Sequence, residues 1–214
     1  ISFSSAQSTF KSNLKAQPAK GANIYGIVES QGKPMAGVAV SDGTEIVLTN
    51  KKGCYSIKSD KKHGYVFVII PSCYEAPLTK GDVVPEFWAN LTEDHTKAER
   101  HDFALSYRDN MKHTMIAVTD IHLANMYHDQ EQFHGNFMPR LREEVEKYQK
   151  QNIPVYTMCT GDSSFDLYWY DYLYDIFSFR STLKEAKYPT PFFNVIGNHD
   201  NDGAVSCGED TDWK

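Results

Sequence analysis

The chain has 214 residues, 41% of them hydrophobic, and a formal net charge of −6 at pH 7. This length and composition suffice for one sizeable core or two smaller ones, and they exclude a chain that is disordered throughout. The acidic balance and the lack of a Lys/Arg run argue against a dedicated nucleic-acid surface. No apolar stretch is long enough to span a bilayer, so we expect a globular protein without a membrane span.

Residues 1–21 are polar and aperiodic, and we expect them to form an N-terminal arm. The first residue is Ile1 rather than a methionine, which suggests either a processed or an engineered start. If a signal peptide has been removed, we expect export to the bacterial periplasm or cell surface. The four cysteines are too few for a disulfide scaffold. Cys54 and Cys73 could pair in an oxidising compartment, or each could remain a free thiol.

Short β-rich runs separated by turn residues follow the arm. The runs fall at residues 24–28, 38–40, 46–49, 55–57, 65–70 and 98–105, with an irregular excursion over 74–96. Gly, Pro, Asn and Asp gather in the intervals, which predicts a small antiparallel β-sandwich. We place this domain at residues 22–107 and a second domain at residues 108–214.

The second domain alternates strands with helices. Strands are expected at residues 115–119, 155–160 and 192–196, a polar loop at 128–131, and helices over 137–148 and 168–186. In the first helix, apolar residues recur at helical spacing at Phe137, Leu141, Val145 and Tyr148. The alternation predicts right-handed crossovers and a parallel sheet, the first half of an α/β fold. The unbroken apolar run of residues 192–196 is typical of a strand covered on both faces.

Each of these three strands runs into side chains that can bind a metal. Asp120 and His122 follow the first strand, Asp162 follows the second, and Asn198, His199 and Asp200 follow the third. Ligand sites in α/β sheets lie at the carboxyl ends of strands, so these side chains should converge.

The residue types at the strand exits indicate which metals they would bind. In an extended exit Asp120 and His122 would point the same way, because strand side chains alternate. Carboxylate, imidazole and amide ligands together suit Mn, Fe, Zn or Mg. We infer two divalent cations bridged by Asp162, with Asp120 and His122 holding one and Asn198 the other.

Three sequence blocks carry a family resemblance. Asp120-Ile121-His122, Gly161-Asp162 and Gly197-Asn198-His199-Asp200 are similar to the first three signature blocks of the calcineurin-like metallophosphoesterases. The resemblance implies hydrolysis of phosphate monoesters or diesters, with the metal ligands assigned as above. It also implies that His199 contacts the phosphate and helps the leaving group depart. Either Asp166 or Asp200 could then fix the tautomer of His199.

The β-rich region carries a second resemblance. Gly26-Ile27-Val28, Lys33-Pro34-Met35-Ala36-Gly37-Val38 and Thr49-Asn50-Lys51-Lys52-Gly53-Cys54-Tyr55 resemble the carboxypeptidase regulatory-like, prealbumin-type β-sandwich. This pattern marks turns and core strands, and it carries no catalysis. Some bacterial calcineurin-like phosphoesterases look as if they have such a domain at the N-terminus.

The C-terminal part departs from the phosphoesterase pattern. That pattern continues with a further His and a Gly-His-x-His block, and no histidine follows His199 here. Either the chain is a fragment truncated before those blocks, or a partner supplies the ligands, or the site is degenerate. A fragment is favoured because the predicted sheet also stops at its third strand.

The missing ligands keep other functions open. One alternative is a non-catalytic binding module, and another is a nuclease of the same fold. The net negative charge of the chain argues against the nuclease. If a substrate stacks on aromatic side chains, Tyr127 and Trp169 near the strand exits are the candidates. The expected substrate is a small phosphate ester or a phosphorylated macromolecule.

Overall fold

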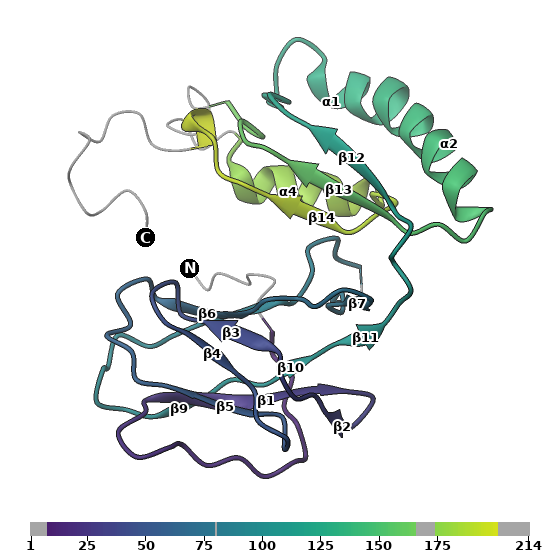
Figure 1. The fold of residues 1–214 in the computed structure, drawn as a ribbon. Helices are drawn as coiled ribbons and strands as arrows, with labels where there is room; N and C mark the ends of the chain where they lie inside the picture. The colour runs from purple at the N-terminus through teal and green to yellow at the C-terminus, as the bar shows by residue number, and fades with distance from the viewer. Residues whose placement is uncertain (1–7, 80, 166–173, 201–214) are drawn as a thin grey trace. The chain divides into compact units, whose positions relative to one another are not determined.

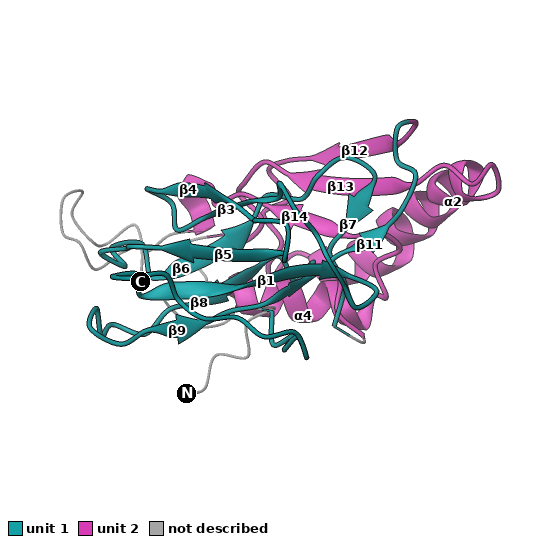
Figure 2. Cartoon of the chain, turned by 60° about the horizontal axis from the view of Figure 1, so that its bottom comes forward, with its two compact units in different colours: residues 1–79, 85–111 teal, residues 80–84, 112–214 magenta. Residues whose placement is uncertain are grey.

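A computed structural model describes residues 8–79, 81–165 and 174–200 (Figure 1). The chain divides into two compact units, residues 1–79 with 85–111 and residues 80–84 with 112–214 (Figure 2). None of the described helices combines the length and the apolar character needed to cross a membrane.

The first unit is built from two sheets and one short strand pair. In one sheet, β1 (Ile24–Ser30) pairs with β2 (Lys33–Pro34), β5 (Cys54–Ile57), β9 (Glu99–Arg100) and β10 (Phe103–Ala104). In the other, the order is β4 (Ile46–Leu48), β3 (Ala39–Ser41), β6 (Tyr65–Val68) and β8 (Trp88–Asn90). The strands β7 (Tyr74–Glu75) and β11 (Ser106–Tyr107) pair with each other. The predicted β-rich runs therefore do form strands.

Alternating side chains from both sheets form the core of this unit. Ile24 and Phe103 from one sheet and Val40 and Val66 from the other are completely buried in a single cluster. The alternation is visible in β6, where Val66 and Val68 are buried while Tyr65 is exposed. Burial of one face of each strand is what the period-two pattern of these runs predicts.

The prediction of a purely antiparallel sandwich is wrong in one place. The strands β9 and β10 run parallel to β1, because the chain leaves β8 in one sheet and crosses to the other sheet beside β1. The predicted strand at 98–105 is divided at Asp102, whose carboxylate accepts hydrogen bonds from Ile27 N at 2.9 Å and Ser12 N at 3.0 Å. Another difference is β8, which lies inside the stretch predicted to be irregular and pairs with β6.

The N-terminal segment from Ser8 onward is held against this unit. Arg100 donates hydrogen bonds from Nη2 to Ser12 O at 3.1 Å and to Leu14 O at 2.8 Å, while Asp102 accepts from Ser12 N. These contacts fix a stretch that the sequence predicts to be an arm. Cys54 and Cys73 are both free thiols in the structure, so the possible disulfide is not formed.

The second unit has the predicted order of strand, helix, strand, helix, strand. The strands β12 (Thr114–Val118), β13 (Val155–Cys159) and β14 (Phe192–Asn194) pair in parallel in that order, which confirms the predicted parallel sheet. After β12 come α1 (Asp129–Gln132), the π-helical η1 (Phe133–Phe137) and α2 (Met138–Gln149). After β13 comes α4 (Ile176–Glu185), and the 3₁₀ turn η2 (Asn198–Asp200) follows β14.

Two helix boundaries differ from the prediction. The polar residues 128–131 were expected to form a loop, but Asp129 already begins α1, which runs through η1 into α2. The second helix begins at Ile176 behind Asp175, whose side chain caps it by accepting a hydrogen bond from Ser178 N at 2.7 Å. Residues 166–173, where the sequence predicts its first turns, lie outside the described residues.

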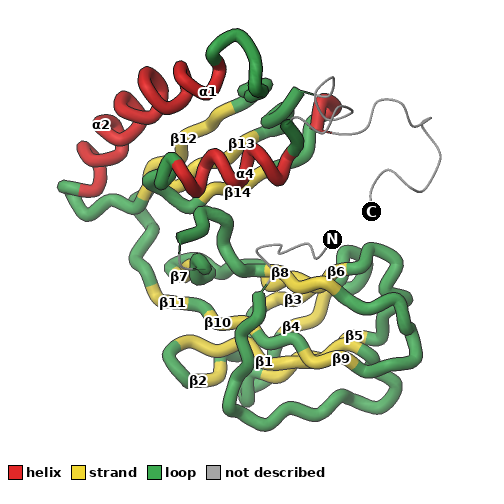
Figure 3. The backbone as a smooth tube through the Cα atoms, turned by 180° about the vertical axis from the view of Figure 1, so that it is seen from behind, coloured by secondary structure: helices red, strands yellow, loops and turns green. Residues whose placement is uncertain are grey.

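The helices α2 and α4 lie on the same face of the second unit's sheet (Figures 1 and 3). Leu141 and Val145 of α2 share a core with Phe179 of α4 and with Phe192 of β14. Right-handed crossovers that always add the next strand on the same side place every connecting helix on one face. The prediction that residues 192–196 are covered on both faces is therefore wrong, and Val195 and Ile196 are 53% and 56% exposed.

The second unit should lose stability at alkaline pH because Tyr188 is buried in this core. Burial raises its pKa to about 12, and its hydroxyl lies 3.3 Å from Thr157 Oγ1. An unfolded tyrosine ionises near pH ~10, so the stabilisation is complete below that pH and is lost as pH rises toward the folded pKa. We expect Tyr188→Phe to reduce the loss of unfolding free energy in this range by about 2–3 kcal/mol in denaturant titrations. The control is Tyr107→Phe, a substitution of an exposed tyrosine. An equal effect of the two substitutions would contradict the attribution of the alkaline loss of stability to Tyr188.

Candidate metal centre

The loops that follow the three parallel strands meet at one edge of the second unit's sheet. The first loop is bonded to the second, because Asp120 N donates to Gly161 O at 3.2 Å and His122 N donates to Asp162 O at 2.9 Å. The third loop is bonded to the second through His199 N, which donates to Asp162 Oδ1 at 2.9 Å. The loop after β13 is therefore the central one, as its strand is in the sheet.

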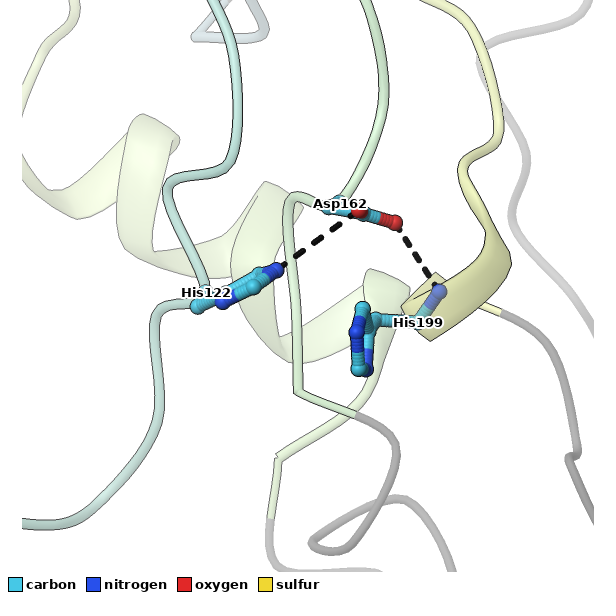
Figure 4. A group of neighbouring side chains, drawn as sticks. All are labelled: His122, Asp162 and His199. Carbon is cyan, nitrogen blue, oxygen red and sulfur yellow. Dashed lines mark hydrogen bonds and ion pairs between the residues drawn. The ribbon is translucent and has the colours of Figure 1, made fainter.

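This convergence brings His122, Asp162 and His199 together, and we call them the three-residue group (Figure 4). One ligand atom from each lies within 4.8 Å of those of the other two. His122 Nε2 is 3.6 Å from Asp162 Oδ2, and the two imidazole rings are 4.6 Å apart between centroids. Each member comes from a different strand exit, as the sequence predicts for a site at the carboxyl edge of the sheet.

Asp162 supplies the negative charge of the three-residue group. The backbone N–H of His199 lowers the pKa of its carboxyl, and the neighbouring imidazoles act in the same direction against a smaller opposing effect of burial. Oδ1 is engaged by that backbone donor, which leaves Oδ2 as the oxygen that faces His122. The residue therefore offers a carboxylate anion with one oxygen directed into the group.

The strand exits are not extended, contrary to the assumption that Asp120 and His122 follow strand alternation. The φ angles of Asp120, His122 and Asp162 are 51°, 45° and 53°, all in the left-handed region. Such angles in residues other than glycine cost of order 1–3 kcal/mol each and cluster at functional sites. The bonds between the loops hold these conformations, and they direct His122 toward Asp162.

The other candidate residues lie outside the three-residue group. Asp120 is exposed and accepts a hydrogen bond from Thr119 Oγ1. Asn198 is exposed at the start of η2. Tyr127 lies in the loop before α1 with 78% of its surface exposed. Asp166 and Trp169 lie outside the described residues.

Asp200 is placed differently from a carboxylate that orients His199. It is 7% exposed, and its Oδ1 accepts hydrogen bonds from Ser164 N at 2.9 Å and Ser164 Oγ at 3.1 Å. Its Oδ2 accepts from Gly197 N at 3.0 Å. These bonds join the second and third loops, which gives Asp200 a structural role in this conformation.

Phe165 is a contact residue that sequence reasoning missed. Its ring stacks on His199 at 5.4 Å and 12° between planes, and it lies edge-on to His122 at 5.7 Å. An aromatic side chain that packs on both imidazoles limits their rotation. No sequence pattern marks this role, because Phe165 belongs to none of the apolar runs and to none of the three signature blocks.

The residues present fit a divalent cation. The imidazole of His122 and the carboxylate of Asp162 are common donors for Zn, Mn or Fe. His122 Nε2 is a buried atom that has no hydrogen-bond partner among the described residues, since 3.6 Å to Asp162 Oδ2 is too long for a hydrogen bond. A buried ring nitrogen without a partner is costly, and a cation between it and the carboxylate would remove that cost.

Comparison with known proteins locates a relationship in the first unit. Residues 22–108 match the family model described as the N terminal of calcineurin-like phosphoesterase. No curated protein and no solved structure matches the chain significantly. The matched residues end before Asp120, so the comparison is independent of the three-residue group. The match of the N-terminal β-rich region supports the calcineurin-like phosphoesterase family as the one to which this chain is related.

Proposed function

We propose that the protein hydrolyses phosphate esters at a metal centre built on the three strand exits of the second unit. The observation that carries this proposal is the three-residue group, in which two imidazoles surround an anionic carboxylate. The family match of the first unit supports the same reaction class on separate grounds.

In this proposal the residues divide between metal binding and proton transfer. His122 and Asp162 would hold one cation together with Asp120, and Asn198 with Asp162 would hold a second. Divalent cations in such sites polarise a phosphoryl oxygen and activate a water molecule. The His199 ring, whose ligand atom lies within 4.8 Å of that of Asp162, would donate a proton to the leaving alkoxide.

The positions of the partners support this division. Asp162 bonds His199 through the backbone N–H, so the histidine is held at the site without occupying its ring for that bond. Phe165 stacks on one side of the ring and limits its rotation. A proton donor whose orientation is restricted in this way acts without first having to be ordered.

The experiment is an assay of aryl phosphate hydrolysis after removal of metal by a chelator and addition of Mn, Zn, Fe or Mg. We expect metal-dependent turnover, and we expect His199→Asn to reduce it by about 100-fold or more, as for the loss of a general acid. His128→Asn is the matched control, since His128 also pairs with a carboxylate but its side chain is 77% exposed.

The substrates in this assay separate the alternatives. Comparing an aryl monoester, an aryl diester and single-stranded DNA distinguishes a phosphatase, a phosphodiesterase and a nuclease. Metal binding without turnover of any of them would favour a binding module. Activity that survives chelation, or that falls equally in both histidine variants, would contradict the proposal.

A further inference from the structure

Two carboxylates join the second and third loops in opposite directions. Asp162 of the second loop accepts a hydrogen bond from His199 N of the third. In return, Asp200 of the third loop accepts from the backbone N–H and the hydroxyl of Ser164 in the second. Each loop therefore supplies a carboxylate that binds a backbone donor of the other.

The second of these connections is deeply buried. Ser164 is completely buried and Asp200 is 7% exposed. Asp200 also closes its own turn, because its Oδ2 accepts from Gly197 N and its backbone N–H donates to Gly197 O at 3.3 Å. The turn that carries His199 is thus fastened at both ends by one residue.

We propose that Asp200 is a positioning residue, which with Ser164 and Gly197 forms a clasp that holds His199 against Asp162. All the hydrogen bonds of the clasp are internal to the protein, so they form without a ligand. Its purpose is to keep the donor atoms of two separate loops at a fixed separation, which favours binding of a cation. The metal-binding consequence rests on the proposed function, whereas the effect on loop order does not.

Removing the clasp should loosen the third loop without deleting any member of the three-residue group. In Asp200→Asn the amide nitrogen must face a backbone N–H of either Gly197 or Ser164, so one donor loses its acceptor. A residue that supports a ligand from outside the coordination shell typically changes metal affinity by about 10–100-fold. We therefore expect Asp200→Asn to weaken Zn²⁺ binding within that range.

The control is a carboxylate that is buried in the same unit but does not touch the loops. Asp82 is 8% exposed and accepts hydrogen bonds from Val83 N and from Arg180. We expect Asp82→Asn to lower thermal stability at least as much as Asp200→Asn, while the folded protein binds Zn²⁺ with unchanged affinity. This comparison separates positioning from general stabilisation.

The test combines Zn²⁺ titration calorimetry with hydrogen exchange of the metal-free proteins. Asp200→Asn should speed exchange of the Ser164 and Gly197 amides by about tenfold or more, because their acceptor is altered. Ser164→Ala, which removes only the hydroxyl bond, should give a smaller change in both measurements. Unchanged Zn²⁺ affinity in a destabilised Asp200→Asn protein would show that the residue is only structural.

Failure of the proposed function has a different signature. If the unaltered protein binds no Zn²⁺, that function is contradicted, and the exchange data alone then decide the clasp. Faster exchange in Asp200→Asn but not in Asp82→Asn would still support it. If the Ser164 and Gly197 amides exchange equally fast in the unaltered protein, Asp200→Asn and Asp82→Asn, the proposed clasp is overturned.

Discussion

Replacing Asp162 with asparagine should lower the affinity of the second unit for Zn²⁺ or Mn²⁺ by more than about 100-fold, beyond the range for residues outside the coordination shell. The amide oxygen of the new side chain would still accept the His199 N–H, so the loops should stay together. The charge at the oxygen that faces His122 would be gone. Calorimetric titration of the metal-free proteins measures this effect directly, and hydrolysis should fall with it.

The same substitution should change the acid stability of the metal-free protein. The folded pKa of Asp162 lies below its usual value, chiefly because of the His199 N–H. Its stabilisation is therefore present above the unfolded pKa, near pH ~4, and is lost as pH falls through the lowered folded pKa. Asp162→Asn should lack this part of the acid dependence in denaturant titrations.

A matched control is Asp60→Asn, an exposed carboxylate in the first unit. It should bind metal as the unaltered protein does and retain the acid dependence. Full metal affinity in Asp162→Asn would place the cation elsewhere and would remove the central residue of the proposed site. Loss of affinity in both variants would point to a general effect of net charge instead.

The sequence was sufficient to predict the elements of the second unit and their parallel pairing. Three apolar runs, each followed by a polar exit, correspond along the chain to β12, β13 and β14, which pair in parallel as predicted. These are local features, and local hydrophobic period and turn residues determine them. The same information does not give the order of strands across the sheet, so it could not show that α2 and α4 lie on one face.

The details of the site depend on contacts between loops distant in sequence. Asp120 and His122 adopt left-handed angles because their backbone is bonded to the loop after β13. Period-two alternation of strand side chains cannot predict these left-handed angles. It led to the prediction that the side chains of Asp120 and His122 point the same way, which holds only for an extended backbone. The role of Asp200 likewise follows from Ser164, which lies 36 residues away in the chain.

The glycines that precede Asp162 and Asn198 bear on the contact between the second and third loops. Glycines precede both Asp162 and Asn198, and a glycine at such a place indicates a close approach of backbone or a special angle. The structure shows both. Gly161 has a φ of 117°, and a Cβ on it would lie 2.8 Å from the Cα of Gly197. The two loops touch because neither glycine has a side chain.

Replacing Gly197 with alanine should therefore separate the second and third loops. The added Cβ would lie 2.1 Å from Asp162 Oδ1 and 2.3 Å from Asp162 N, and backbone must move to relieve the second contact. We expect a loss of about 1–3 kcal/mol in unfolding free energy, as for overpacking elsewhere. Since the shift carries Asp162 away from His199 N, Zn²⁺ binding should be lost as completely as in Asp162→Asn.

Gly135→Ala is the matched control for this substitution, because a Cβ there meets no atom within 4 Å and the residue lies in the helical η1. It should keep full Zn²⁺ affinity and gain up to about 1 kcal/mol from the better helix propensity of alanine. Thermal unfolding and calorimetry of both variants measure the two effects together. If Gly197→Ala binds Zn²⁺ and unfolds as the unaltered protein does, the loops are not in contact in solution, and both the three-residue group and its clasp would have to be abandoned.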